Sequence, residues 1–157
     1  MNKVAAPTAV DAWRSLVETH ALLWRLLGDD LESECGISLV DYEVLLRLHD
    51  AADHRLRLQD LVSPGRMTKS GVSRLVDRLE ATGLIRLESC PSDRRGAFAV
   101  LTPKGRAMQE CGAMVHVRGI NQYFAATLRP GEDQQLTSVL NRIRAGLPGA
   151  TPRDCAS

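Results

Sequence analysis

Apolar positions recur every three or four residues through most of the chain, which predicts a largely helical protein. The first such stretch begins at Val10 and continues to Leu31, and Gly36 marks the end of that helix. Ser38 then stands where an N-cap is needed, directly before a second helical stretch over residues 39–49. The N-terminal third of the chain is therefore expected to form two helices.

The middle of the chain predicts two further helices separated by a tight break. LRLQDLV at 56–62 is interpreted as a short helix, and Ser-Pro-Gly at 63–65 ends it. Thr68 is the expected N-cap of the next helix, and Gly83 is its expected end. One apolar stripe of that helix consists of Val72, Leu75, Val76 and Leu79.

The pattern then changes to alternation, which predicts extended chain. Residues 84–90 and 97–101 read as two strands, and PSDRRG at 91–96 has the chemistry of a turn between them. Helical spacing returns after Thr102-Pro103, a cap followed by proline in the first turn, and continues toward Leu128. A last helix contains Leu136, Val139, Leu140, Ile143 and Leu147.

The distribution of charge along the chain is more informative than its net charge of +1. Residues 1–52 carry four Lys/Arg against nine Asp/Glu, residues 53–106 carry eleven against six, and the remainder carries five against four. A basic middle after an acidic start is typical of a nucleic-acid-binding module within a larger scaffold. Ordinary surface charge is the alternative interpretation of this split taken alone.

The helix that follows Thr68 has the residues that a DNA-reading helix needs. The face opposite its apolar stripe carries Lys69, Ser70, Ser73, Arg74, Asp77 and Arg78. Short hydrogen-bonding side chains and arginines near a helix N-terminus suit the major groove, which admits one helix. The hairpin adds Arg94 and Arg95 beside Asp93, positioned to contact a minor groove or phosphates. A solvated helix face and a polar turn are the alternatives for the two elements taken separately.

A longer stretch carries a family resemblance. SRLVDRLEATGLIRLESCPSDRRGAFAVLTPKGRA at 73–107 resembles the MarR family of bacterial regulators, which has a recognition helix with TRLVDRLE…GL, a wing with DRR, and a following LT-x-x-G. The resemblance continues upstream through ISLVDYEVLLRL, and the layout of the flanking helices also agrees. It therefore covers nearly the whole chain.

The resemblance implies a winged helix-turn-helix domain within a helical homodimer. The implied segments are an N-terminal dimerisation helix at 1–38, the DNA-binding domain at 39–104, C-terminal dimerisation helices at 105–150 and a flexible tail at 151–157. The implied partner is a pseudo-palindromic double-stranded DNA site, usually with repression and with release by a small ligand or by oxidation. Carried over by position, the DNA-binding residues are Thr68, Lys69, Ser70, Ser73, Arg74 and Arg78, with Asp93, Arg94 and Arg95 in the wing.

The effector is less defined by the sequence. A small aromatic or phenolic ligand is what the family implies, and Trp13, His20, Trp24 and Tyr42 are candidates for lining its cleft. The alternative is that these four residues belong to the dimer core.

The cysteines and histidines indicate neither a metal site nor a cofactor. Cys35 and His116 fall near positions that hold zinc in some relatives, but paired histidines one helical turn apart are absent. Cys35 is an alternative redox thiol, whereas Cys90 and Cys111 are interpreted as small apolar fillers. The chain is long enough not to need disulfides, so we expect a reducing compartment, the cytoplasm.

Other classes of protein fit the sequence less well. We find no Ser/His/Asp arrangement, phosphate-binding glycine loop or metal-ligand cluster, so an enzyme is not expected. No apolar run reaches the roughly 18 residues of a membrane span. Two alternatives remain: a winged-helix protein-interaction module without DNA binding, and a metal- or redox-responsive regulator that uses Cys35.

Overall fold

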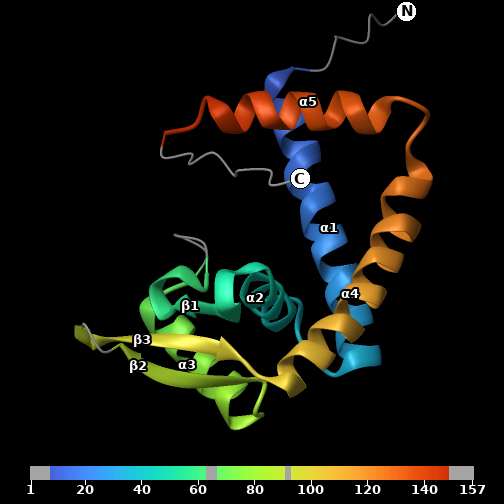
Figure 1. Ribbon diagram of the computed structural model, residues 1–157. Helices are drawn as coiled ribbons and strands as arrows, with labels where there is room; N and C mark the ends of the chain where they lie inside the picture. The colour runs from blue at the N-terminus through green and yellow to red at the C-terminus, as the bar shows by residue number, and fades with distance from the viewer. Residues whose placement is uncertain (1–7, 63–66, 91–92, 149–157) are drawn as a thin grey trace, which may run out of the picture. The chain divides into compact units, whose positions relative to one another are not determined.

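The computed structural model describes residues 8–62, 67–90 and 93–148, with only the backbone described at residues 90 and 93–96. Its helices are α1 (Ala9–Cys35), α2 (Leu39–Asp50), α3 (Lys69–Ala81), α4 (Pro103–Tyr123) and α5 (Glu132–Ala145), and its strands are β1 (Arg55–Arg57), β2 (Ile85–Cys90) and β3 (Asp93–Leu101) (Figure 1). Short 3-10 turns occupy Ala52–His54 (η1), Leu58–Asp60 (η2) and Ala125–Thr127 (η3). The predicted fold class, mostly helical with a small hairpin, is confirmed.

The chain forms two compact units, Met1–Gly119 and Ile120–Ser157. The first contains α1, α2, α3, the sheet and most of α4, and the second contains α5. None of the helices within the described ranges has both the length and the apolarity that a membrane span requires. The predicted division into dimerisation and DNA-binding segments stays a prediction, and the tail at 151–157 lies outside the described residues.

Local chemistry places the helix ends where the sequence predicts them. The backbone of Gly36 has φ 70°, and its N–H donates to the carbonyl of Glu32 at 3.1 Å, which ends α1. The hydroxyl of Ser38 accepts the N–H of Asp41 at 3.1 Å, and the Asp41 carboxylate accepts from Ser38 in return. Gly83 has φ 72° after α3.

The sheet has the order β1-β3-β2 and is antiparallel throughout. Leu56, Ala99 and Leu87 lie in register across it, so their side chains share one face. Helices α2 and α3 contact this sheet, and Ala99 is fully buried. The core between helices and sheet is built mainly from leucine, with Leu45, Leu48, Leu61, Leu75 and Leu79 among its most buried side chains.

The prediction of a helix over 56–62 was wrong. Residues Arg55–Arg57 form β1, and only Leu58–Asp60 turn helically, as a 3-10 turn. A helix of two turns is marginal in isolation, whereas Arg-Leu-Arg gains backbone pairing with β3. The guanidinium of Arg55 also lies over the ring of Phe98, 4.1 Å from its centroid.

The predicted turn of the hairpin was too long. Strand β3 begins at Asp93, which pairs with Cys90, so only residues 91–92 lie between the strands. Ser89 pairs with Ala97, so residues 94–96 have no counterpart in β2 and form a bulge. Arg94 and Arg95 therefore belong to the bulged start of β3 rather than to the turn.

Candidate nucleic-acid interface

Helix α3 is held with one face inward and the other outward. Leu75, Val76 and Leu79 are buried in the core. The hydroxyl of Thr68 caps the helix by accepting the N–H of Gly71 at 3.1 Å, and lies 3.1 Å from the hydroxyl of Ser70. The capped first turn of α3 is consequently fixed in space while its side chains remain available.

The outward face contains the predicted DNA-binding residues. Lys69, Ser70, Ser73 and Arg74 are exposed and follow one another at helical spacing from the first turn onward. Within the described part of the chain, neither Lys69 nor Arg74 has an ion-pair partner. This face can therefore offer two cations and the hydroxyl of Ser73 to a groove, together with the hydroxyl of Ser70, which is hydrogen-bonded to Thr68.

Arg78 has a structural partner that the sequence did not reveal. Its Nη2 donates to Oδ1 of Asp41 at 2.5 Å, linking the second half of α3 to the first turn of α2. Asp41 is only 6% exposed, while its Oδ2 accepts the hydroxyl of Ser38 at 2.8 Å. The Ser38–Asp41 capping pattern is visible in the sequence, but the approach of Arg78, 37 residues away, is not.

Asp41→Ala is expected to lower the free energy of unfolding by about 1–3 kcal/mol, because it removes a capping box and a charge-assisted hydrogen bond together. Asp11 provides the matched control, since it closes the same kind of capping box with Thr8 at the exposed start of α1. Asp11→Ala should have a much smaller effect in urea denaturation. Equal losses in the two variants would show that the Arg78 contact adds nothing.

The hairpin of β2 and β3, the expected wing, is held in place at the end opposite its turn. The hydroxyl of Thr102 donates to the carbonyl of Gly83 at 2.7 Å and accepts the N–H of Gly105 at 3.0 Å. Gly105 is buried, and a Cβ added there would overlap the carbonyl oxygen of Leu84. The Leu-Thr-x-x-Gly pattern after the wing thus joins the start of α4 to the end of α3 and the start of β2.

The predicted wing residues are described only in part. The backbone of Asp93, Arg94 and Arg95 lies in β3, and their side chains lie outside the described residues. Their assignment to DNA binding therefore stays a prediction.

The sequence analysis did not consider Arg55 and Arg57, whose guanidiniums both lie over the ring of Phe98 on the sheet. Alternation of Arg-Leu-Arg is the signal that could have placed them on a strand.

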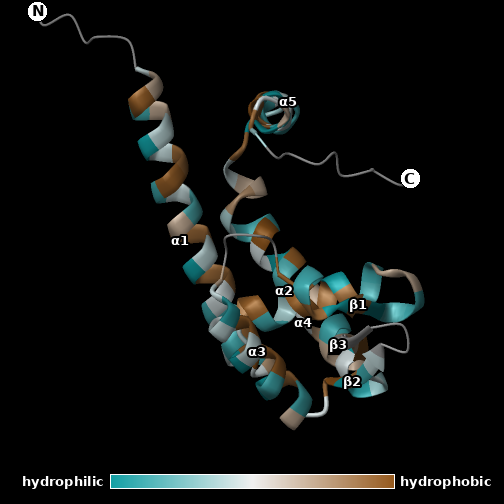
Figure 2. Ribbon diagram, turned by 90° about the vertical axis from the view of Figure 1, so that its left-hand side faces the viewer, coloured by the Kyte–Doolittle hydropathy of each residue, from teal (hydrophilic) through white to brown (hydrophobic). Residues whose placement is uncertain are grey.

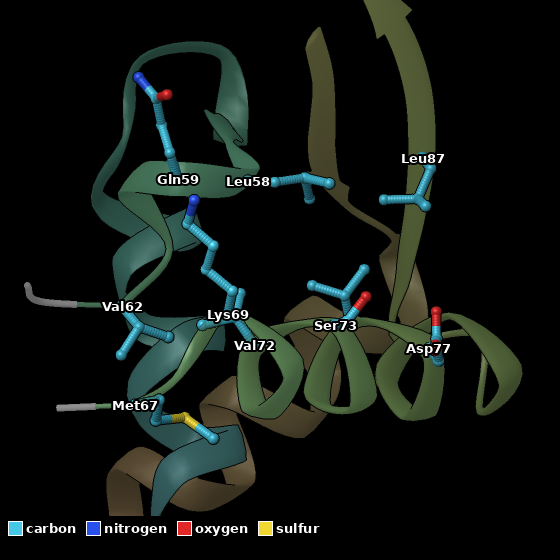
Figure 3. A pocket seen from close by; sticks show the side chains of 10 residues that line it. Leu58, Gln59, Val62, Met67, Lys69, Val72, Ser73, Asp77 and Leu87 are labelled. Carbon is cyan, nitrogen blue, oxygen red and sulfur yellow. The ribbon is translucent and has the colours of Figure 1, made fainter. Parts of the chain in front are cut away.

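A cavity of about 570 Å³ lies beside α3, between η2, α3 and β2 (Figure 3). Its lining is mainly apolar, with Leu58 and Leu87 on opposite sides. Lys69, Ser73 and Asp77 contribute polar groups from α3. The remaining lining residues are Gln59, Val62, Met67, Val72 and Val76.

The four predicted effector-cleft residues are spread along the first unit. His20 and Trp24 are ring neighbours on α1, with centroids 5.6 Å apart. Trp13 is 65% exposed near the start of α1, roughly 27 Å along the helix from Leu31 by the rise of 1.5 Å per residue. Tyr42 is buried near Leu31, where its ring lies 5.0 Å from that of His116.

The environment of His116 and Tyr42 disfavours charge on either ring. Burial lowers the pKa of His116, although the nearby Glu43 carboxylate acts in the opposite direction. Burial also raises the pKa of Tyr42, and Asp50 adds to that effect. The two rings therefore pack as neutral groups near neutral pH.

Cys35 and Cys111 form a disulfide between the end of α1 and the middle of α4. The interpretation of Cys111 as a small apolar filler was therefore wrong, because its sulfur is bonded to that of Cys35. The pairing was not visible in the sequence, since the two residues are 76 positions apart and meet only in the folded chain. In the described ranges, no three histidine, cysteine or carboxylate side chains come together as metal ligands could. The two residues considered as metal ligands have other partners instead: Cys35 bonds to Cys111, and His116 packs against Tyr42.

Comparison with known proteins gives a consistent result. Residues 36–96 match the model of the MarR family. The chain is similar to Sco3205 of Streptomyces coelicolor, a MarR family transcriptional regulator solved in complex with DNA, at 33% identity and a TM-score of 0.80 over 94% of each chain. It is also similar to AbsC, a MarR family transcriptional regulator of the same organism, at 34% identity and a TM-score of 0.79 over 92% of this chain and 97% of AbsC.

A further similarity is shorter. The HTH-type transcriptional repressor YetL of Bacillus subtilis (strain 168) is 32% identical over 75 residues. That match includes 48% of this chain and 45% of YetL, so it spans less than half of the repressor.

Proposed function

The chain belongs to the MarR family of transcriptional regulators, and we propose that it is a homodimeric repressor that inserts α3 into the major groove of a pseudo-palindromic DNA site. The observation that carries this proposal is the exposed face of Lys69, Ser70, Ser73 and Arg74 opposite the buried stripe of α3. It is a DNA-binding regulator and not an enzyme. We infer that it acts in the cytoplasm.

The chemistry of this face fits base and phosphate contacts. An arginine can donate two parallel hydrogen bonds to guanine, and serine hydroxyls can contact any base edge. Lys69 and the N-terminus of α3 suit phosphate oxygens, because both present positive charge there. The bulge in β3 supports a wing that reaches the neighbouring minor groove, since it redirects the chain at Arg94 and Arg95.

Exposed apolar side chains support the homodimer. In the first unit, α1 exposes Val10 and Trp13 by 63% and 65%, and Leu16 and Val17 follow on the same helix. Hydrophobic bands continue along α1 to its N-terminal end (Figure 2). In the second unit, α5 exposes Val139, Leu140 and Ile143. We propose that a second copy of the chain covers these surfaces, and a two-fold dimer requires a pseudo-palindromic site.

Selection of fragments from the host's genomic DNA by the purified protein at physiological salt tests the proposal. Enrichment of one pseudo-palindromic motif is expected, with two half-sites about one helical turn apart. A folded dimer that enriches no motif would contradict sequence-specific binding and favour a winged-helix protein-interaction module. Transcription from the enriched promoter, with and without the protein, then separates repression from activation.

Replacement of both Arg94 and Arg95 by alanine is expected to weaken DNA binding while leaving the dimer folded. A dimer would lose four cations from its wings. The slope of log K against log salt should therefore become shallower, by up to about 3–4 if all four contact phosphates. Fluorescence anisotropy across a salt series measures this slope. An unchanged dissociation constant at physiological salt would exclude the wing from the interface.

A small-molecule effector is the proposed means of release. The cavity beside α3 supports it, because Lys69 and Ser73 line the cavity and are also among the residues that we propose contact DNA. A ligand there would compete with DNA for the same side chains. The aromatic candidates Trp13, His20, Trp24 and Tyr42 remain a second proposed location. The selected DNA provides the assay, since an effector must release it.

A further inference from the structure

The three-stranded sheet carries a group of arginines on its outer face. Side chains alternate between the two faces of a sheet, and Leu56, Ala99 and Leu87 belong to the face that packs toward the core. The opposite face presents two rows of residues in register, which are Arg57–Phe98–Glu88 and Arg55–Val100–Arg86. These positions hold three arginines and one glutamate, so the outer face has an excess of positive charge.

Two guanidinium groups share one aromatic ring on this face. The Cζ atoms of Arg55 and Arg57 lie 4.1 Å and 5.5 Å from the ring centroid of Phe98. A cation is attracted to the face of an aromatic ring, and both arginines are half-buried against the sheet. Val100, in the same row as Arg55, is only 7% exposed, as expected where an arginine stem lies over its neighbour. The two cations are therefore held close together on β1 and β3.

The carboxylate on this face does not balance the arginines. Glu88 lies 3.9 Å from Arg55 and also forms an ion pair with Arg86. One negative charge is thus divided between two arginines, and Arg57 adds a third cation in the row beside them. Like charges this close repel, so a bound anion would be favoured here. A guanidinium that stacks through its face keeps N–H groups at its edge, which can donate to phosphate oxygens.

The place of these arginines in the fold favours DNA as the source of the anion. Phe98 lies on β3, the same strand that begins with the predicted wing residues Asp93, Arg94 and Arg95. Three residues of extended chain, about 10 Å, separate Arg95 from Phe98. Strand β1, which carries Arg55 and Arg57, forms one edge of the sheet beside β3 (Figure 1). The basic face is therefore continuous with the proposed DNA interface.

We propose that Arg55 and Arg57, held on the ring of Phe98, bind backbone phosphates of the DNA that flanks each half-site. This contact is electrostatic and independent of base sequence, and it lies outside the bases that α3 and the wing are proposed to contact. The ring positions both guanidiniums before DNA arrives, so binding costs less side-chain freedom. The inference rests on the proposed function, because it extends the same DNA interface.

The test compares two duplexes that contain the same selected genomic site. The short duplex ends at the outer edges of the two half-sites, and the long duplex adds about one helical turn on each side. The full-length dimer should bind the long duplex about tenfold more tightly or better, because four arginines then meet flanking phosphates. Fluorescence anisotropy over a salt series measures both the affinities and the salt slopes.

Arg55→Gln combined with Arg57→Gln should remove the advantage of the long duplex. The slope of log K against log salt should become shallower by up to about 3–4 on the long duplex and should not change on the short one. Arg14→Gln combined with Arg25→Gln is the matched control, since these arginines of α1 pair with acidic residues at the surface. The control loses the same net charge and should keep the advantage of the long duplex.

A second measurement alters the DNA and needs no variant that must fold. Uncharged methylphosphonate linkages placed only in the flanks of the long duplex should lower its affinity for the parent protein to that of the short duplex. An equal advantage of the long duplex for the parent and for the Arg55/Arg57 variant would overturn the proposal, and the basic face would then fit an acidic protein segment. So would an unchanged affinity for the methylphosphonate duplex. If the parent prefers neither duplex to a scrambled one, the proposed function fails instead.

Discussion

Gly105→Ala is expected to destabilise the protein by about 3 kcal/mol or more, because the new methyl group would meet backbone rather than a flexible side chain. The added Cβ would overlap the carbonyl oxygen of Leu84 and lie 2.8 Å from a methyl group of Leu101. The Leu84 carbonyl cannot move alone, since it accepts hydrogen bonds from the N–H and the hydroxyl of Thr102. Helix α4 must shift away from the wing. Thermal and urea denaturation measure the loss.

Gly28→Ala is the matched control, because Gly28 also lies inside a helix but has room for a methyl group. The nearest atom to its added Cβ is Cβ of Leu39, at 3.8 Å, an ordinary contact. Alanine is favoured over glycine within helices by about 0.5–1 kcal/mol, so this variant should be more stable than the parent. A similar loss of stability in both variants would show that the close approach at Gly105 is unimportant.

Helix boundaries could be predicted because short-range chemistry decides them. Ser38, Thr68 and Thr102 each accept a backbone N–H three residues later, and Gly36 and Gly83 adopt positive φ, which glycine reaches most easily. All of these contacts lie within a few residues. The exposed face of α3, which we propose contacts DNA, could be predicted from the same periodicity, since the buried stripe determines which side chains point outward.

Features that depend on distant partners could not be predicted. Strand β1 exists because Leu56 pairs with Ala99, and the sequence near Leu56 is equally compatible with a helix. The Asp41–Arg78 pair and the Cys35–Cys111 disulfide join residues 37 and 76 positions apart. Their partners are chosen by the packing of whole helices. No local pattern distinguishes Arg78 from Arg74, although one binds a buried carboxylate and the other faces outward.

The apolar stripe of α1 illustrates a different limit. Its spacing predicts one continuous buried face, yet Val10 and Trp13 are exposed while Leu31 is buried. Hydrophobic periodicity predicts that one face of a helix is buried, but not whether it packs against the same chain or against another. The apolar face of the first half of α1 is explained only by the proposed dimer, which cannot be predicted from the periodicity of one sequence.

Arg74→Ala is expected to produce the largest loss of DNA affinity among single substitutions. An arginine that donates two hydrogen bonds to a guanine contributes about 1–3 kcal/mol of discrimination, and a symmetric dimer loses that contact twice, or about 2–6 kcal/mol. Arg74 is exposed and its substitution removes no buried contact, so the denaturation midpoint should hardly change. Anisotropy titrations with the selected site and a scrambled duplex measure both affinity and preference.

Two further variants serve as controls for interpreting the Arg74→Ala result. Arg25→Ala removes the same charge from α1, where Arg25 pairs with Asp29 at the surface, and should leave DNA binding unchanged. Arg78→Ala should lower stability as well as affinity, because Asp41 would lose its partner. If Arg74→Ala weakened binding to the selected and scrambled duplexes equally, Arg74 would be a phosphate contact and base readout would fall to Ser70 and Ser73. If it weakened neither, α3 would not be the recognition helix, and the basic middle of the chain would need another partner.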